Sequence, residues 1–283
     1  MIYFETFSVP TVDTLFLLIL SILTLESAHS IRFLYQHFLS GITEKSLNVF
    51  YYACSYAKVD YSRFMNTTVR ITLKLIPDSL QTQPVFLCVD DTMVSKFGTK
   101  FENVSKLFDH AAHNGSNYLN GHCFVSVMLC VPVWNRDKVS YLSVPLGYRM
   151  WQEKAPLNQT GSDRMKYIPL LLYSLRWNIE TSYYEQKTFW SFYNYMVRSC
   201  KGIEMLVNLI NISYCAMKIL PYQNEHFSEY RTKSVQEFCF ELSQGIRSQI
   251  FFATFVKNIE THIKSNAMTK ALKQLIHQQV YHL

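Results

Sequence analysis

The sequence predicts an α+β protein that is mostly helical. Hydrophobic residues make up 49% and aromatic residues 15% of the 283 residues, so the chain folds around a sizeable core. Only 8 Gly and 8 Pro occur, which argues against a turn-rich all-β sandwich. Long helical runs flank a central stretch of three strand-like runs. We therefore expect a helical region over 1–80, a mixed region over 84–200 and a helical region over 201–283.

The first region contains two runs of helical length, 11–39 and 46–76, with few helix breakers. The stretch 15–25 is apolar apart from Ser21 and Thr24. A membrane span needs about 20 apolar residues, so this stretch is too short for one. It predicts a buried helix that begins near Thr11 or Asp13, and no membrane segment.

Basic side chains recur through the same region. A solvated face of a helical bundle accounts for them most simply, and a DNA-contacting surface is the alternative. The residues are Arg32, Lys58, Arg63, Arg70 and Lys74.

The middle region begins after a linker over 77–84 that starts and ends with proline. The run "VFLCVDDT" predicts a buried strand that ends in Asp90 and Asp91. The runs "HCFVSVMLCVPVW" and "KVSYLSVPLGYRMW" predict two further strands, separated by the turn "NRD". The three runs together predict a β-meander.

Helices follow the meander. Residues 152–168 are typical of a loop, in which Ser162 or Asp163 could cap the next helix. Pro169 suits a first helical position, and a helix is predicted from there to about residue 199. A second helix follows over 202–220, and a helical basic tail begins near residue 228.

Charge and cysteine content narrow the function classes only slightly. The formal charge of +6 is mildly basic, which is compatible with nucleic acid but also with many solvated surfaces. The seven cysteines are odd in number and widely spaced, and no Cys-x-x-Cys pair occurs. This pattern predicts buried, reduced thiols in a cytoplasmic protein rather than a zinc or redox site.

Four polar residues in the third helical run have an unusual spacing. At about 100° per residue, Tyr173, Arg176, Glu180 and Lys187 fall within one stripe about 60° wide. A buried, unpaired carboxylate is costly, so Glu180 must face a partner, water or a metal ion. An exposed salt-bridged face would give the same spacing.

The spacing Tyr-x2-Arg-x3-Glu-x6-Lys resembles the signature of bacterial insertion-sequence transposases that carry a DDE catalytic triad on an RNase H-like fold. All four positions match, and the strand "FLCVDDT" is similar to the first catalytic strand of that group. The resemblance covers about residues 85–220. It implies an RNase H-like core and a DNA transposase acting at the nucleoid in the bacterial cytoplasm.

The resemblance also implies roles for individual residues. Asp90 or its neighbour Asp91 would be the first ligand of a pair of Mg²⁺ ions and Glu180 the last. Only one of the two aspartates can serve, because adjacent side chains on a strand point to opposite faces. Tyr173, Arg176 and Lys187 would contact DNA phosphates in the terminal inverted repeats of the element.

The family also needs a middle aspartate at the end of a fourth strand. Asp109 lies in a predicted connection between strands, Asp137 in a hairpin turn and Asp163 at the start of the third helical run, so none ends an apolar strand. We therefore expect an internally shortened copy with an incomplete RNase H-like core and defective catalysis. The alternative is a non-catalytic DNA-binding remnant that associates with itself or with an intact transposase and interferes with it.

Overall fold

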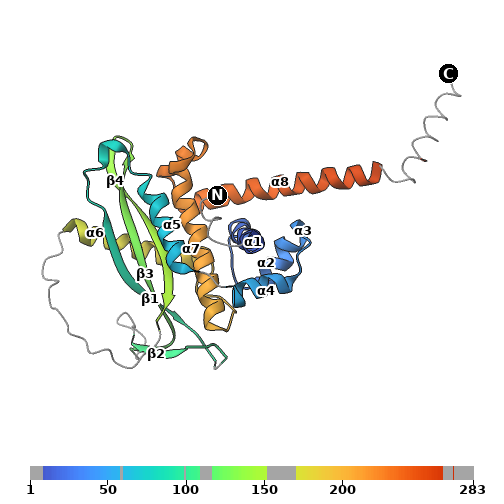
Figure 1. Cartoon of the computed structure of the whole chain (residues 1–283), viewed down its shortest axis with the longest axis horizontal. Coiled ribbons are helices and arrows are strands. Elements are labelled where there is room, and N and C mark those ends of the chain that lie inside the picture. The colour runs from blue at the N-terminus through green and yellow to red at the C-terminus, as the bar shows by residue number, and fades with distance from the viewer. Residues whose placement is uncertain are drawn as a thin grey trace, which may run out of the picture.

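The computed structural model describes residues 9–57, 60–98, 100–108, 117–151, 170–263 and 270. They form an α+β fold with a small antiparallel sheet (Figure 1). The predicted α+β fold class is therefore confirmed. The strands are β1 Phe86–Ser95, β2 Ser105–Phe108, β3 Tyr118–Asn135 and β4 Lys138–Met150. The α-helices are α1 Val9–Leu25, α2 Ile31–Leu34, α3 Ser40–Ile42, α4 Leu47–Tyr56, α5 Tyr61–Leu73, α6 Leu170–Phe189, α7 Cys200–Gln223 and α8 Val235–Ile263. A π-helix, Tyr35–Leu39, joins α2 to α3, and 3₁₀ helices span Asp78–Leu80 and Glu225–Thr232.

Strand β3 is the centre of the sheet. It pairs antiparallel with β1, with β2 and with β4, and Phe124 lies opposite both Thr92 and Met150. Strands β1 and β4 therefore lie on opposite sides of β3. The predicted turn between β3 and β4 is present as a two-residue connection, with positive φ at both Arg136 and Asp137. Such a turn has the twist that a tight hairpin requires.

Helices cover both faces of the sheet. One face carries Phe124 and Met128 of β3 into a large apolar cluster with residues of α1, α6 and α7. The other face carries Leu129 and Val131 into a smaller cluster with Ile71 of α5. Alternation along β3 thus sends successive side chains into two different cores, which fixes its register.

The apolar stretch near the N-terminus forms the buried helix that the sequence predicts. Leu18 and Ile22 of α1 are fully buried against the core, although the helix begins at Val9 rather than near Thr11 or Asp13. Helix α7 is the described helix that is long and apolar enough to cross a bilayer, but 72% of the relevant window is buried in the protein. Its apolar character is that of a core helix.

Several predicted boundaries are wrong. The run 11–39 is divided at Glu26, which has a positive φ. The run 46–76 is divided at Asp60, whose carboxylate caps α5 by accepting a hydrogen bond from the Arg63 amide. Helix α6 stops at Phe189 instead of continuing to residue 199, and Ser191 just beyond it has a positive φ. A positive φ is costly for these residues within a helix, so each marks a break.

Candidate functional site

The two aspartates lie in the middle of β1 and not at its end. The strand continues for four residues to Ser95, with Thr92 and Val94 buried, so the predicted strand end at Asp91 is wrong. Asp90 is half-buried on the face that packs against α6, and Asp91 is exposed on the other face. The alternation of a strand imposes this separation.

The four residues of the Tyr-x2-Arg-x3-Glu-x6-Lys spacing lie on one continuous helix. Tyr173, Arg176, Glu180 and Lys187 all belong to α6, so their predicted arrangement along one side follows from its helical backbone. Glu180 and Lys187 are half-buried, whereas the side chains of Tyr173 and Arg176 lie outside the described residues.

Helix α6 is tied to β1 by two side chains. The Tyr183 hydroxyl donates to the main-chain oxygen of Asp90 at 2.9 Å, and Lys187 Nζ donates to that of Met93 at 3.0 Å. Because Tyr183 lies one turn after Glu180, these bonds bring the Glu180 turn of α6 to the same side of the sheet as Asp90. The two bonds hold α6 against β1 beside Asp90.

A buried lysine, Lys96, bonds the connection between α6 and α7. Lys96, just after β1, donates to the carbonyl oxygens of Tyr193 at 2.7 Å and Tyr195 at 3.2 Å, and lies 3.6 Å from the Tyr195 ring centroid. Burial lowers the pKa of its ammonium to about 8. The contacts tie the end of β1 to the connection between α6 and α7, which holds α6 in place.

Asp91 and Asp90 both line one open hollow, in which Asp91 contacts a cysteine. The Cys123 thiol donates to Asp91 Oδ2 at 3.2 Å, within an open hollow of about 470 Å³ that Leu107 and Trp151 also line. Burial, and then the bond to Asp91, raise the pKa of the Cys123 thiol to about 12. The pair is therefore a neutral thiol donating to a carboxylate, and the thiol is not poised as a nucleophile.

No group of three carboxylates that includes Asp90 or Glu180 occurs among the residues that the structure describes. Asp137 is exposed in the β3–β4 turn, whereas Asp109 and Asp163 lie outside the described residues. No cluster of three His, Cys, Asp or Glu side chains suited to a metal ion occurs in the described part of the chain. The described residues therefore do not supply the ligand set that a pair of Mg²⁺ ions requires.

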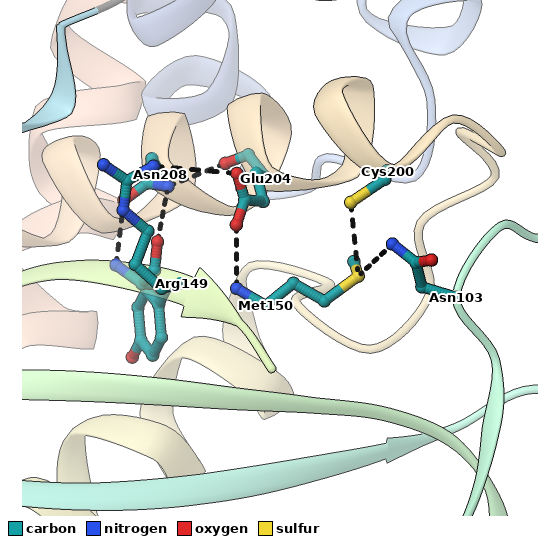
Figure 2. A network of polar contacts seen from close by, with 7 residues as sticks. Asn103, Arg149, Met150, Cys200, Glu204 and Asn208 are labelled. Carbon is teal, nitrogen blue, oxygen red and sulfur yellow. Dashed lines mark hydrogen bonds and ion pairs between the residues drawn. The ribbon is translucent and has the colours of Figure 1, made fainter. Parts of the chain in front are cut away.

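A polar network that sequence patterns did not predict joins α7 to β4 (Figure 2). Asn208 accepts from the Tyr148 amide at 2.9 Å and donates to the Tyr148 carbonyl oxygen at 3.0 Å. Glu204, one turn earlier, accepts from the Met150 amide at 2.9 Å and lies 3.7 Å from the Arg149 guanidinium. Strand β4 has no neighbouring strand on its outer side in the part of the chain that the structure describes. The Asn208 carboxamide there bonds both main-chain groups of Tyr148, as a neighbouring strand would.

The side of α7 that carries Glu204 and Asn208 makes further bonds along β4. Asn211 and the Cys215 thiol both donate to the carbonyl oxygen of Pro145 at 3.0 Å. Gly147 makes the close approach possible: its φ is +156°, and a Cβ there would lie 3.1 Å from Asn208 Oδ1. The signal was present in the sequence, because polar residues at 204, 208 and 211 recur at helical spacing in an otherwise apolar run.

A second polar surface lies on α5 and its C-terminal cap. Arg63, Arg70 and Lys74 are exposed and fall within about 40° of one another around the helix axis. The sequence of α5 contains no acidic residue, and the carboxylate nearest the stripe in sequence is that of the N-terminal cap, Asp60. Such a stripe can contact successive phosphates of a nucleic acid backbone.

Comparisons of the chain with models of protein families, with curated proteins and with solved structures found no match.

Proposed function

We propose that this chain is an internally shortened transposase of a bacterial insertion sequence that binds the terminal repeats of its element and does not cleave them. The observation that carries the proposal is the pairing of two motifs in space. The helix with the Tyr-x2-Arg-x3-Glu-x6-Lys spacing packs on the strand that carries Asp90, through the Tyr183 bond to the Asp90 carbonyl oxygen.

The chemistry supports binding better than cleavage. In intact members of the family, two Mg²⁺ ions held by three carboxylates would supply the activated nucleophile and stabilise the leaving oxygen. Asp90 and Glu180 account for two of those carboxylates, and the described residues offer no third one beside them. Binding, in contrast, needs only cations and hydrogen-bond donors placed along the phosphate backbone.

Two groups of residues would make that contact. Tyr173, Arg176 and Lys187 would reach phosphates from α6, with Lys187 exchanging its bond to the Met93 carbonyl oxygen for a phosphate oxygen. The basic stripe of α5 would supply a second set of contacts on another element. A chain that occupies terminal repeats in this way, at the nucleoid in the cytoplasm, would compete with an intact transposase for its substrate.

The basic stripe gives the test of DNA binding. We expect the triple variant Arg63→Gln/Arg70→Gln/Lys74→Gln to bind a terminal-repeat duplex at least about 10-fold more weakly at 0.1 M salt. The slope of log Kd against log salt should fall by about 0.9 for each phosphate that the variant no longer neutralises. Fluorescence anisotropy of a labelled duplex measures both quantities.

The matched control removes three exposed cations from other parts of the chain, through Lys100→Gln, Lys138→Gln and Lys201→Gln. Both triple variants have the same net charge, so a uniform charge effect would weaken them equally. Equal weakening would contradict a specific role for α5, and an unchanged slope in both variants would contradict DNA binding by this surface.

A cleavage assay separates the shortened protein from an active enzyme. With Mg²⁺ present, we expect bound terminal-repeat DNA to remain intact on a denaturing gel. Strand cleavage that Glu180→Gln abolishes would instead assign the intact transposase activity to this chain, with the third carboxylate supplied from outside the described residues.

A further inference from the structure

A polar cavity lies beside α7, apart from the residues used in the proposed function. It is open to solvent, has a volume of about 190 Å³, and is lined by residues of β3, β4, α6, α7, the segment after α7 and the start of α8. Helix α6 contributes Asn178 and Thr181 to the wall. At about 100° per residue, these lie about 160° and about 100° around the helix from Glu180. The cavity therefore faces another side of α6 than the one that carries Glu180 and Lys187.

Lys218 of α7 lines this cavity, and no described residue accepts a hydrogen bond from its ammonium or forms an ion pair with it. The side chain is half-buried, because the cavity opens beside it. Protein nonetheless surrounds the ammonium closely, and this burial lowers the pKa of Lys218. A cation removed from water in this way is costly unless another group supplies a partner.

The carboxylate of Glu185 does not fill that role. Its charge partly offsets the lowering of the Lys218 pKa, but no ion pair joins the two side chains. The Tyr214 hydroxyl donates to Glu185 Oε2 at 2.5 Å, so this carboxylate is already engaged. The ring of the same tyrosine lies with its centroid 5.7 Å from Lys218 Nζ. This cation–π contact is weak and leaves the N–H donors of the ammonium free.

The rest of the wall offers further positive charge. The described residues that line the cavity include Arg231 and Lys233 and contain no aspartate or glutamate. Lys233 lies 3.6–3.9 Å from three glutamate carboxylates outside the wall, so its charge is balanced. Arg231 donates from Nε to the Pro221 carbonyl oxygen at 2.8 Å, and no described residue bonds its two terminal nitrogens. Lys218 and Arg231 are therefore the cations available to a ligand.

A neutral donor completes the wall. The hydroxyl of Ser143, a buried residue of β4, accepts from Asn178 Nδ2 at 2.9 Å and lies 3.3 Å from Cys130 Sγ. Lys218 lies near the same cysteine, because its charge lowers the pKa of that thiol against the larger effect of burial. A hydroxyl that accepts from an amide keeps its own proton to donate. Ser143 can therefore add a hydrogen bond to a ligand held by Lys218.

We propose that this cavity binds a phosphate group, either as inorganic phosphate or as part of a small phosphorylated molecule, through Lys218 and Arg231. Ammonium and guanidinium groups both bond phosphate oxygens strongly. At about 30 Å³ for each water, the cavity holds roughly six non-hydrogen atoms, which is about the size of a phosphate ion. The open side lets the rest of a larger molecule extend into solvent, whereas a DNA duplex is too wide to enter.

The test is isothermal titration calorimetry of the dialysed full chain with inorganic phosphate, with the ionic strength kept constant by sodium chloride. We expect saturable binding with a Kd of about 1 mM or lower. Lys218→Met keeps the aliphatic chain and removes the charge, so it should bind phosphate at least about 10-fold more weakly. Its melting temperature should not fall, because an unpaired buried charge is removed.

Two further variants complete the experiment. Arg231→Gln changes an exposed residue, so it should remain folded and also bind phosphate more weakly. Lys201→Met is the matched control, because Lys201 is an exposed lysine of the same helix outside the cavity, and it should bind phosphate as the native chain does. The affinity for a DNA duplex should be the same in Lys218→Met as in Lys201→Met.

Three results would overturn the proposal. The first is a native chain that shows no saturable heat up to about 10 mM phosphate. The second is phosphate binding that Lys218→Met leaves unchanged or that Lys201→Met weakens equally. The third is a Lys218→Met variant that binds duplex DNA more weakly than Lys201→Met while the native chain binds no free phosphate. That outcome would assign Lys218 to a DNA backbone instead of a small molecule.

Discussion

The two outer strands of the sheet are completed by helices in different ways. Along β4, four residues of α7 bond main-chain groups of Pro145, Tyr148 and Met150, and most of these bonds are buried. Along β1, α6 contributes the Tyr183 and Lys187 bonds, and Leu87 and Val89 remain 65% and 67% exposed. The β4 side is built for stability, whereas the β1 side keeps its carboxylates half-buried or exposed, within reach of a ligand.

Polar residues in these helices play two different roles. Asn208 and Lys187 are both polar residues of long helices, and both bond the main chain of a strand. Asn208 is buried and bonds both main-chain groups of Tyr148, so its role is satisfied within the protein. Lys187 is only half-buried, and in the function proposed above its ammonium would exchange the Met93 carbonyl oxygen for a phosphate.

The largest expected effect is on the β4 side. Asn208→Ala removes the acceptor of the Tyr148 amide and the donor to its carbonyl oxygen, and leaves both groups buried without a partner. We expect the free energy of unfolding to fall by about 2–4 kcal/mol, measured by urea denaturation. The matched control Asn66→Ala, at an exposed position of α5, should change it by less than about 0.5 kcal/mol. Equal effects would show that α7 does not complete the β4 edge.

The buried contact of α4 with α1 and α7 should affect stability at alkaline pH. Burial raises the pKa of the Cys54 thiol from 9.0 to about 12, so the unfolded chain loses this proton at a lower pH than the folded chain. The folded state then binds more protons above pH 9, and its stability falls as pH rises from 9 towards 12. We expect Cys54 alone to lower the free energy of unfolding by about 1–2 kcal/mol between about pH 9 and about pH 10.5.

Lys96 acts in the opposite direction, so the measurement compares two chains. Its pKa of about 8 in the folded state lies below its ordinary 10.5, so its contribution to stability rises with pH between these values. This contribution is the same in the native chain and in Cys54→Ala, and it cancels in the difference. Denaturation curves of both chains from about pH 8 to about pH 10.5 should diverge above about pH 9. Parallel curves would mean that Cys54 is not in a dry interior.

A smaller effect is expected where α6 meets β1. Tyr183→Phe removes one hydrogen bond to the Asp90 carbonyl oxygen and keeps the ring, so stability should fall by about 0.5–1.5 kcal/mol. Tyr184→Phe is the control, because Tyr184 is the next residue of the helix and is 63% exposed. A loss as large as that of Asn208→Ala would remove the contrast between the two sides of the sheet.

The smallest effect on stability is expected at Asp91. Asp91→Asn keeps the shape of an exposed side chain, so the free energy of unfolding should change by less than about 0.5 kcal/mol. The pKa of Cys123 should fall from about 12, because Asp91 raises it through both a hydrogen bond and its charge. Alkylation of Cys123, followed by mass spectrometry between about pH 8 and about pH 10.5, should become faster. The same rate in Asp91→Asn as in the control Asp137→Asn would contradict the Cys123–Asp91 contact.

Much of the architecture was predictable because it depends on local patterns. The alternating runs that became β3 and β4, the turn at Arg136 and Asp137, and the buried α1 helix all follow from periodicity and turn chemistry. The stripe on α6 was also predictable, because a helical backbone determines which of its residues share a side.

Contacts between distant segments were not predictable in the same way. The end of β1 was missed because Asp90 and Asp91 look like a boundary, although Thr92 and Val94 continue the buried face of the strand. The role of Asn208 depends on β4, which lies about 60 residues earlier in the chain, so no local pattern names its partner. The contact of Tyr183 with the Asp90 carbonyl oxygen likewise joins residues 93 positions apart.

One measurement tests the proposed function most directly. The full chain is incubated with Mg²⁺ and a duplex carrying the terminal repeat of its element, beside a scrambled duplex of equal length. The products are then resolved on native and denaturing gels. We predict a complex with the terminal repeat that is tighter than with the scrambled duplex, weakens steeply with salt and contains only uncut strands. Equal affinity for both duplexes would contradict recognition of the element's ends, and cut strands would contradict the loss of catalysis.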